Sequence, residues 1–230
     1  MRSARKVPAF FLFRILRLLP TPDSFPGHTR TSKTAMPELL LTTARLLLRP
    51  WRAEDAAALY EAARDPRVGP AAGWPPHRSV AESAGIIRTV FSAPETYAVT
   101  LRGTDRPVGC VGLLFPADSH FAIGGSEAEV GYWLGRPWWG RGLIPEAVGE
   151  LARHAFEELG LTALWASCFV DNAASRRVLE KCGFRYVRTD ALPECPDGTL
   201  HRGEIRLLTR EAWLCGATPA ARPDDPAPSA

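Results

Sequence analysis

The sequence lacks the cysteine and histidine patterns that would indicate disulfide bonds or a bound metal. Its five cysteines are an odd number, and none of them forms a Cys-x-x-Cys pair. Cys110, Cys168 and Cys182 lie among apolar residues, which is typical of buried thiols in a reducing compartment. The five histidines are scattered, without a cysteine or carboxylate at ligand spacing, so we expect no metal site.

Two nucleotide-binding patterns and long apolar runs are also missing. A dinucleotide-binding Gly-x-Gly-x-x-Gly would need a third glycine after Gly140 and Gly142, but the chain has Pro145 there. No Gly-Lys-Ser/Thr follows that would indicate a P-loop. The apolar stretch of residues 7–19 is interrupted by Arg14 and Arg17, so it is too short and too charged to span a membrane. We therefore expect no membrane partner.

Charge and composition divide the 230 residues into three parts. Residues 1–35 hold seven basic side chains and one acidic, and the remaining residues hold 21 basic and 24 acidic. A slightly acidic body argues against nucleic acid as the main partner and suits a cationic substrate. We predict a disordered or mis-assigned extension over 1–37, one domain over 38–215 and a disordered tail over 216–230. An organellar presequence or an imperfect secretory signal is the alternative for the extension.

The body of the chain predicts a mixed α/β domain. The predicted strands cover residues 42–49, 96–101, 107–115, 128–134, 163–169, 184–188 and 203–209. The predicted helices cover 54–64, 80–91 and 173–181, and another follows the glycines. In that helix Ala147, Leu151 and Ala155 form one apolar row, and Gly160 fits its C-terminal cap.

Gly140 and Gly142 carry the strongest functional signal in the chain. They end a strand-like run and open a strongly periodic helix. Such a turn leaves backbone N–H groups pointing outward at the positive end of the helix dipole, which suits a phosphate or pyrophosphate. Because Gly-x-Gly also occurs in ordinary strand-to-helix turns, the pattern gains meaning only from its neighbours.

A second block, residues 171–184, follows this helix after one strand. By itself it is explained by helix formation, with Asn172 as the N-cap and Gly183 at the end. The joint pattern, however, resembles the GNAT superfamily of N-acetyltransferases, and more narrowly its ribosomal-protein-alanine N-acetyltransferase branch. The resemblance covers residues 40–213. It is carried by Arg45-Leu-Leu-Leu-Arg49, Glu129-Val-Gly-Tyr-Trp-Leu134, Trp139-Gly-Arg-Gly142, Glu146-Ala147, Asn172, Ser175 and Gly183-Phe184.

The resemblance implies a mostly antiparallel sheet of about seven strands with one splayed parallel pair, flanked by about four helices. Acetyl-CoA, the co-substrate, would lie where the strands ending near Leu134 and Phe169 separate, its pantetheine arm pairing with the backbone as an added strand would. The implied cofactor contacts are Trp133, Leu134, Gly135, Trp139, Gly140, Arg141, Gly142, Leu143, Ile144, Asn172 and Ser175. Two departures from the family are Trp139, usually Arg or Gln, and Ile144, usually Gly or Ala.

For amine acetylation, the amine must be neutral when it attacks and the departing thiolate must gain a proton. Glu129 is the predicted base, acting directly or through water, and a strand-end or ion-pairing carboxylate is the alternative. Glu204 is a second candidate. The family's usual tyrosine proton donor would fall at Leu179, so Ser175 is expected to protonate or orient the thiolate.

Direct transfer is expected, without a covalent enzyme intermediate, because Cys168 and Cys182 lack the paired base that a nucleophilic cysteine needs. The acceptor would enter opposite the cofactor, near Trp74, His77 and Trp138, although a tryptophan in a proline-rich loop is often a packing residue. A peptide or protein N-terminal amine is the favoured acceptor. A small amine (antibiotic, polyamine or amino acid) and a non-catalytic acyl-CoA sensor are the alternatives. We expect a cytoplasmic protein, and a homodimer is possible.

Overall fold

The computed structural model describes residues 39–120, 122–192 and 199–216. The predicted N-terminal extension and nearly all of the predicted tail lie outside these residues. Within the described part of the chain, no helix is long and apolar enough to cross a membrane.

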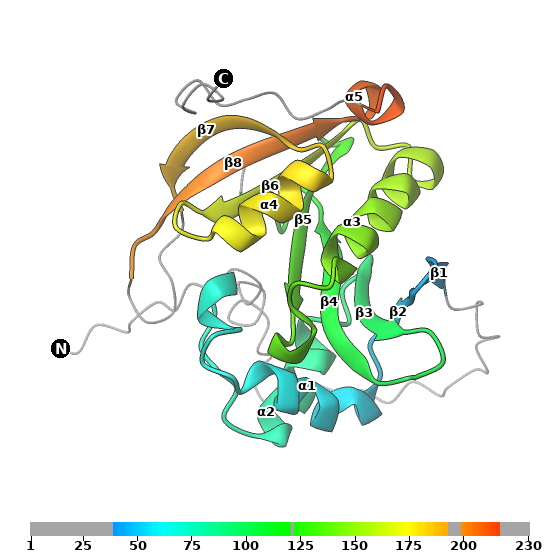
Figure 1. The fold of residues 1–230 in the computed structure, drawn as a ribbon, viewed down its shortest axis with the longest axis vertical. Coiled ribbons are helices and arrows are strands. Elements are labelled where there is room, and N and C mark those ends of the chain that lie inside the picture. Colours follow the sequence, from blue (N-terminus) through cyan, green and yellow to red (C-terminus); the bar gives the residue numbers. More distant parts are fainter. Residues whose placement is uncertain (1–38, 121, 193–198, 217–230) are drawn as a thin grey trace, which may run out of the picture.

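Eight strands form one sheet in the order β1-β2-β3-β4-β5-β6-β8-β7 (Figure 1). The strands are β1 (Leu41–Thr42), β2 (Leu46–Pro50), β3 (Thr96–Leu101), β4 (Pro107–Leu114), β5 (Glu127–Leu134), β6 (Ala163–Phe169), β7 (Arg185–Ala191) and β8 (Arg202–Thr209). Neighbours pair antiparallel except β5 and β6, which are parallel. The predicted mixed, mostly antiparallel sheet with one parallel pair is confirmed.

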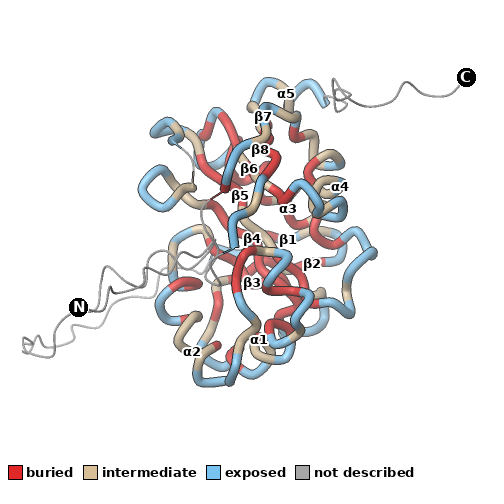
Figure 2. The backbone as a smooth tube through the Cα atoms, turned by 90° about the vertical axis from the view of Figure 1, so that its left-hand side faces the viewer, coloured by how far each residue is buried: buried red, intermediate tan, exposed pale blue. Residues whose placement is uncertain are grey.

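Five helices flank this sheet in the described chain. They are α1 (Ala56–Ala63), α2 (Val80–Thr89), α3 (Leu143–Arg153), α4 (Ala173–Lys181) and α5 (Arg210–Leu214). Helices α3 and α4 lie beside one another over one face, whereas α1 and α2 lie at the lower end in Figures 1 and 2 and pack on the other face. In Figure 2 the residues along the sheet and on the inner side of α3 are coloured as buried, and those of the outer loops as exposed.

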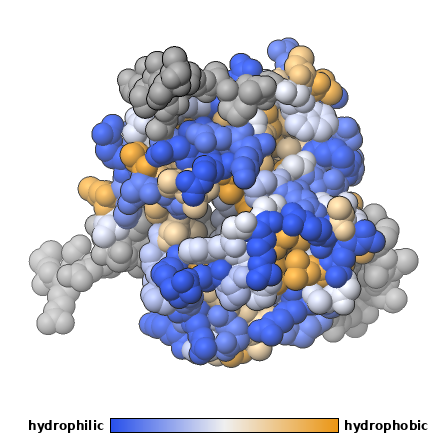
Figure 3. All heavy atoms as spheres, viewed as in Figure 1, coloured by the Kyte–Doolittle hydropathy of each residue, from blue (hydrophilic) through white to orange (hydrophobic). Residues whose placement is uncertain are grey.

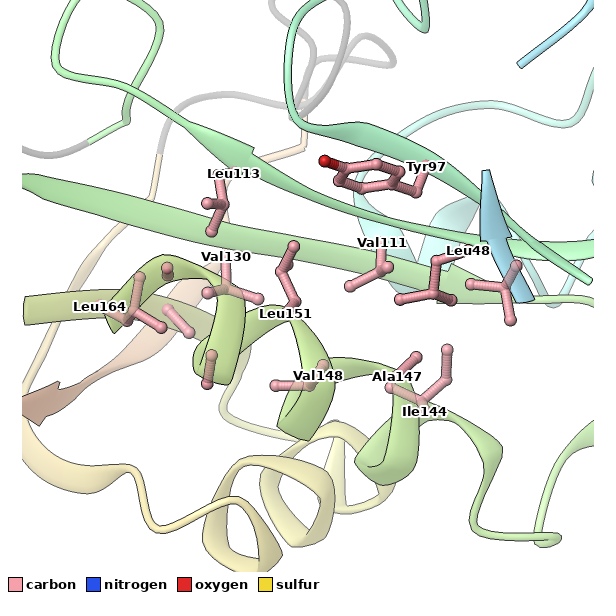
Figure 4. Packing of buried hydrophobic residues seen from close by; sticks show 14 of the residues in the cluster. Leu48, Tyr97, Val111, Leu113, Val130, Ile144, Ala147, Val148, Leu151 and Leu164 are labelled. Carbon is pink, nitrogen blue, oxygen red and sulfur yellow. The ribbon is translucent and has the colours of Figure 1, made fainter. Parts of the chain in front are cut away.

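Helix α3 forms because its apolar residues recur at helical spacing. Ala147 and Leu151 are fully buried, and the predicted apolar row is confirmed. Figure 4 shows Ile144 and Val148 from the same helix side directed at the sheet, where Val130 and its neighbours face them. Burying a leucine or valine side chain contributes about 1.5–3 kcal/mol each, so this face anchors the helix whose first turn carries the glycines.

Aromatic rings dominate the opposite face of the sheet. Trp51 stacks on Phe91 with ring centroids 4.7 Å apart, and Trp74 meets Trp133 edge-on at 5.8 Å. All four are buried beneath α1, α2 and the segment between them. Trp133 comes from β5, so this cluster fixes the strand that carries the proposed cofactor contacts.

Two details of the fold differ from the sequence prediction. The strand expected over 42–49 is two strands, because a turn bonds the Thr43 N–H to the Leu46 carbonyl at 3.0 Å. The Thr43 hydroxyl also accepts the Leu46 N–H at 2.9 Å, which closes the turn. The short helix α5, capped where the Thr209 hydroxyl accepts the Ala212 N–H, was not predicted. The sheet therefore has one strand more and the described chain one helix more than expected.

The parallel pair separates after three residues. Residues 127–129 of β5 pair with 163–165 of β6, and β6 then continues beside β8 alone. The Gly135 N–H donates to the Val108 carbonyl of β4 at 2.8 Å. Alternate β5 residues therefore bond to β4, and the peptide groups of Tyr132 and Leu134 face the gap. The gap thus exposes a strand edge that a second extended chain can pair with.

Candidate active site

The gap between β5 and β6 opens into a cleft of about 620 Å³, which we call the cleft. Seen as spheres, the same side of the molecule is hollowed near its middle (Figure 3). The end of β5, the glycine turn (residues 139–144) and the start of α4 line it. Of the predicted cofactor contacts, its walls include Trp133, Leu134, Trp139, Gly140, Gly142, Leu143, Ile144, Asn172 and Ser175, but neither Gly135 nor Arg141.

The glycine turn has the geometry of an anion site. Gly140 and Gly142 have φ of 75° and 71°, the left-handed region that a Cβ disfavours. Gly142 is the N-cap of α3, and no side chain caps the helix there. The first N–H groups of the helix therefore remain for a ligand, and a phosphate also gains from the helix dipole. These residues fit the pyrophosphate of acetyl-CoA.

An arginine from the β1–β2 turn braces the glycine turn from behind. Arg45 donates to the carbonyls of Arg141 and Gly142 at 3.0 and 3.2 Å, and its Nε donates to Glu146 at 2.6 Å. Partial burial alone would raise the pKa of Glu146, but donors from Thr43 and Arg45 outweigh it, so the pKa is lowered. Arg45 thus holds the turn through its carbonyl groups, so the N–H groups of the turn remain for a ligand in the cleft.

Trp139, one of the two departures from the family pattern, bonds to the strand edge. Its indole Nε1–H donates to the Leu134 carbonyl at 2.7 Å, while the residue remains 45% exposed. That carbonyl is one of the groups with which a pantetheine arm would pair. An incoming arm therefore meets the Tyr132 peptide group and the Leu134 N–H, or displaces the indole.

A smaller hollow of about 70 Å³, the inner hollow, adjoins the cleft. It is lined by Ala71, Ala72, Trp74, Leu114, His120, Glu129, Val130, Gly131, Tyr132, Trp133, Ser167, Cys168, Phe169, Ser175 and Leu192. Tyr132, Trp133 and Ser175 line both spaces, so the two are continuous at these residues. The volume is well above the ~15 Å³ that one water needs, so a small reacting group fits.

Two hydroxyl groups meet where the cleft and the inner hollow join. The Tyr132 hydroxyl lies 2.7 Å from Ser175 Oγ, and it also donates to the Ser175 carbonyl at 3.2 Å. Burial raises the pKa of Tyr132, which keeps the phenol protonated at neutral pH. Tyr132 was not predicted as a site residue, although strand alternation places it on the α4 side of β5.

Glu129 lies at the other end of the inner hollow, with its side chain 5% exposed. It accepts hydrogen bonds from the Ser119 hydroxyl at 3.0 Å and from the His120 N–H at 2.8 Å. His120 Nδ1 lies 3.0 Å from Glu129 Oε1. His120 was not predicted as a site residue, because its contact requires residues 115–119 to turn back, where the Phe115 carbonyl accepts two backbone N–H groups.

The structure does not bring Glu204 to this group. Glu204 is fully buried on β8, and its carboxylate lies 2.9 Å from both Arg206 and Arg176. Arg206 also reaches Glu180 of α4 at 3.0 Å. Glu204 lines neither the cleft nor the inner hollow. Its geometry is that of an ion-pairing carboxylate that joins α4 to the sheet.

Asn172 caps α4, as predicted. Its Oδ1 accepts the Ser175 N–H at 3.0 Å, and its Nδ2 donates to the Ala71 carbonyl at 3.1 Å. The carboxamide therefore positions Ser175 and ties α4 to the segment before Trp74. Asn172 also lines the cleft, where contact with the cofactor stays a prediction.

Of the three predicted acceptor contacts, His77 shares one pocket with Trp138 and another with Trp74. Trp74 lines the inner hollow, and Trp138 lines the cleft. His77 lies behind Trp74, with ring centroids 5.2 Å apart, and its Nδ1 is 2.8 Å from Ser83 Oγ. Burial lowers the pKa of His77, which favours its neutral form. His77 therefore supports Trp74 from outside the hollow.

Two of the described cysteines have thiols that burial keeps protonated. Burial raises the pKa of Cys110 and of Cys182 to about 12, so both remain protonated at neutral pH. Over residues 39–120, 122–192 and 199–216, no group of three or more His, Cys, Asp and Glu side chains could hold a metal ion.

Comparison with known proteins points to the same family as the glycine turn and the separated strands β5 and β6. Residues 45–185 match the family model described as acetyltransferase (GNAT) domain. The uncharacterized N-acetyltransferase YoaA of Bacillus subtilis is 28% identical over 151 residues, which cover 64% of this chain and 82% of YoaA. The FsC-acetyl coenzyme A-N(2)-transacetylase of Aspergillus fumigatus is 38% identical over 90 residues, and the match spans 38% of each chain.

A solved structure shows the same fold. The RimJ protein of Mycobacterium smegmatis, in complex with CoA-disulfide, superposes with a TM-score of 0.58 at 23% identity, covering 72% of this chain and 82% of RimJ. The family model spans the glycine turn, β5 and α4, which line the cleft, and β6, which lines the inner hollow. The chain belongs to the GNAT family of acetyltransferases.

Proposed function

We propose that the protein transfers the acetyl group of acetyl-CoA directly to a primary amine, and that the amine is the N-terminal α-amine of a peptide or protein. One observation carries the proposal: the cleft and the inner hollow meet at Tyr132 and Ser175, with Glu129 beyond them. A thioester held in the cleft would present its carbonyl carbon at this junction, and an amine in the inner hollow would face it.

The cleft suits a cofactor with phosphates at one end and a thioester at the other. The glycine turn offers backbone N–H groups to the pyrophosphate, and Arg177 and Lys181 of α4 line the same cleft. The free edge of β5 offers peptide groups to the pantetheine arm. The Leu134 N–H would polarise the thioester carbonyl, which becomes an oxyanion during attack.

In the transfer, the amine nitrogen bonds to the carbonyl carbon, and the carbon–sulfur bond breaks. The nitrogen gives up a proton toward the Glu129 end of the inner hollow. The departing sulfur gains a proton from the Ser175 hydroxyl, whose partner Tyr132 lies within hydrogen-bond distance. Proton donors and acceptors placed in this way contribute about 10²–10⁴-fold in rate.

The acceptor proposal rests on amine acidity. A free α-amino group has a pKa of about 8, whereas a lysine side chain has one of about 10.4. To make a lysine amine neutral near pH 7.5, the protein would have to lower its pKa by about 3, which costs about 4 kcal/mol. An α-amine does not need this correction. The described walls of the inner hollow hold no lysine or arginine to assist that shift.

A small amine is the second candidate, because the Aspergillus fumigatus relative, 38% identical over the matched segment, is named as an N(2)-transacetylase. Thiol release from acetyl-CoA should be measured over N-terminal peptides, polyamines, aminoglycosides and amino acids. We expect turnover with the peptides. Turnover restricted to the small amines would replace the proposed acceptor, and acetyl-CoA binding without turnover would favour a sensor. Failure to bind acetyl-CoA would refute the proposal.

A further inference from the structure

One hydrogen bond joins the two outer walls of the cleft, and the proposed function gives it no role. Asn172 Nδ2, at the start of α4, donates to the Ala71 carbonyl at 3.1 Å. We propose that residues 69–73 form a strap over the acetyl end of bound acetyl-CoA, and that Asn172 is a positioning residue that latches this strap to α4. The inference rests on the proposed binding of acetyl-CoA and adds what holds the thioester in place.

The strap lies where the cleft and the inner hollow join. Ala71 and Ala72 line both spaces, and so do Ser175 of α4 and Trp133 of β5. Trp133 is buried, whereas Ala71 is exposed. The junction therefore has the strand on its inner side and the bond between strap and α4 on its outer side. Figure 1 shows the strap, in cyan, beside the first turn of α4.

The strap is fixed at its base and held at its tip by that single bond. The N–H of buried Trp74 donates to the Gly69 carbonyl at 3.0 Å, which ties the two ends together. A Cβ on Gly69 would lie 2.5 Å from the Trp74 carbonyl oxygen, and Gly73 has a φ of 83°, so this tight base requires glycine at both positions. In the described chain, residues 70–72 bond to another element only through Asn172.

A latch at this point acts on the arm of the cofactor and not on its phosphates. The pantetheine arm is flexible, so ordering its thioester end costs conformational entropy. The closed strap limits that end to the space between β5 and the strap, next to Ser175, and keeps water from it. CoA leaves this space only when the tip moves, so the latch slows release.

The two ends of the Asn172 carboxamide have separate tasks, which a substitution can separate. Its Oδ1 caps α4 by accepting the Ser175 N–H at 3.0 Å, and its Nδ2 holds the strap. Serine and asparagine cap helices about equally well. Asn172→Ser therefore keeps a capping oxygen and loses the donor of the latch.

The first test measures the dissociation of acetyl-CoA and of CoA from the full chain by stopped flow. Asn172→Ser is expected to raise koff about 3- to 10-fold, the value of one hydrogen bond, with a melting temperature within about 2 °C of the parent. The Kd of adenosine 3′,5′-bisphosphate, which has phosphates but no arm, should stay the same.

A change within the strap itself should act through the same latch. Pro70→Gly loosens the tip without removing a donor, and it should raise koff about 2- to 5-fold in the parent but add nothing in Asn172→Ser. Pro66→Gly is the matched control, because this exposed proline of the same connection lines neither the cleft nor the inner hollow.

Two results would overturn the inference. One is an equal loss of affinity for adenosine 3′,5′-bisphosphate in Asn172→Ser. The other is additive effects of Pro70→Gly and Asn172→Ser, since Asn172 would then contact the cofactor directly rather than through the strap.

A second measurement needs no ligand. The N–H groups of residues 72–74 bond to carbonyls within the strap, at 2.9, 3.3 and 3.0 Å. Their hydrogen exchange should be about 3- to 10-fold faster in Asn172→Ser than in the parent, and an unchanged rate would refute the latch. Failure of the proposed function looks different: the parent would acetylate no amine, while the exchange result would still decide whether Asn172 latches the strap.

Discussion

The brace behind the glycine turn gives the sharpest test of how this fold binds its cofactor. Changing Arg45 to Met keeps the aliphatic stem and removes the guanidinium that holds the carbonyls of Arg141 and Gly142. It also removes the ion pair with Glu146. The chemistry at Ser175 is not touched, so the perturbation separates cofactor binding from transfer.

The magnitude follows from the exposure of the groups involved. The Arg45 and Glu146 side chains are 51% and 19% exposed, so their ion pair is worth about 0–1 kcal/mol. The two bonds to carbonyls add about 0.5–1.5 kcal/mol each when formed in full, and less at this exposure. If the ordered glycine turn loses about 1–2 kcal/mol of stabilising free energy, the Kd of acetyl-CoA rises about 5- to 30-fold. At saturating acetyl-CoA, kcat should stay within about twofold of the parent.

Calorimetric titration of the full chain measures this directly, with acetyl-CoA and with acetyl-pantetheine, which lacks the pyrophosphate. Arg102→Met is the matched control, because Arg102 contacts the Thr43 carbonyl of the same β1–β2 turn but not the glycine turn. An unchanged acetyl-CoA Kd would refute the reasoning. So would an equal loss of affinity for acetyl-pantetheine, since the effect would then not pass through the phosphate site.

The pH dependence of this brace has a definite sign. The pKa of Glu146 is lowered, because donors from Thr43 and Arg45 outweigh partial burial. A carboxyl group with a depressed pKa contributes stability that is complete above its unfolded value of about 4.5 and is lost as the pH falls through the folded value. From pH 6 to 8 the brace therefore adds no pH dependence to the acetyl-CoA Kd.

Three further predictions test other parts of the molecule. Tyr132→Phe removes the hydroxyl that contacts Ser175 at the junction. It should lower kcat about 10-fold, the value of one buried hydrogen bond, while the acetyl-CoA Kd stays constant. An unchanged kcat in steady-state kinetics, with only the Kd altered in a titration, would contradict this. Arg49→Met leaves buried Asp55 without its bidentate partner and should cost about 3–5 kcal/mol in urea unfolding, where a loss below 1 kcal/mol would disprove the buried pair. Iodoacetamide at pH 8 should modify exposed Cys215 well before Cys182, whose pKa burial raises to about 12, and mass spectrometry reads the order.

Local patterns in the sequence were enough for several parts of the site. The apolar row of α3, the glycine turn that opens the helix and the Asn172 cap each depend on residues within a few positions of one another, and each is present. Glu204 shows a local signal that was not used. Arg206 lies two positions on, and in a strand that places both side chains on the same face, ready to pair.

Contacts between distant residues could not be predicted in this way. Arg45 meets the glycine turn about a hundred positions away, and Tyr132 meets Ser175 across 43 positions. Strand alternation states which face Tyr132 occupies, but not which turn of which helix lies opposite. The position of α4 depends on the separation of β5 from β6, which is a property of the whole sheet. His120 reaches Glu129 only because its loop folds back on β5.

The register of β5 would let one short strand serve both substrates of the proposed reaction. Glu129 and Trp133 are separated by four positions and face the side of α1 and α2, whereas Tyr132 faces α4. The same strand therefore places the proposed proton path of the acceptor on one face and the hydroxyl pair on the other. A slip of one residue would exchange the two faces and put the Glu129 carboxylate among the apolar residues beneath α3. The pairing with β4 and the Trp133 cluster oppose such a slip, so the aromatic core on the far face also maintains the alignment of the proposed site.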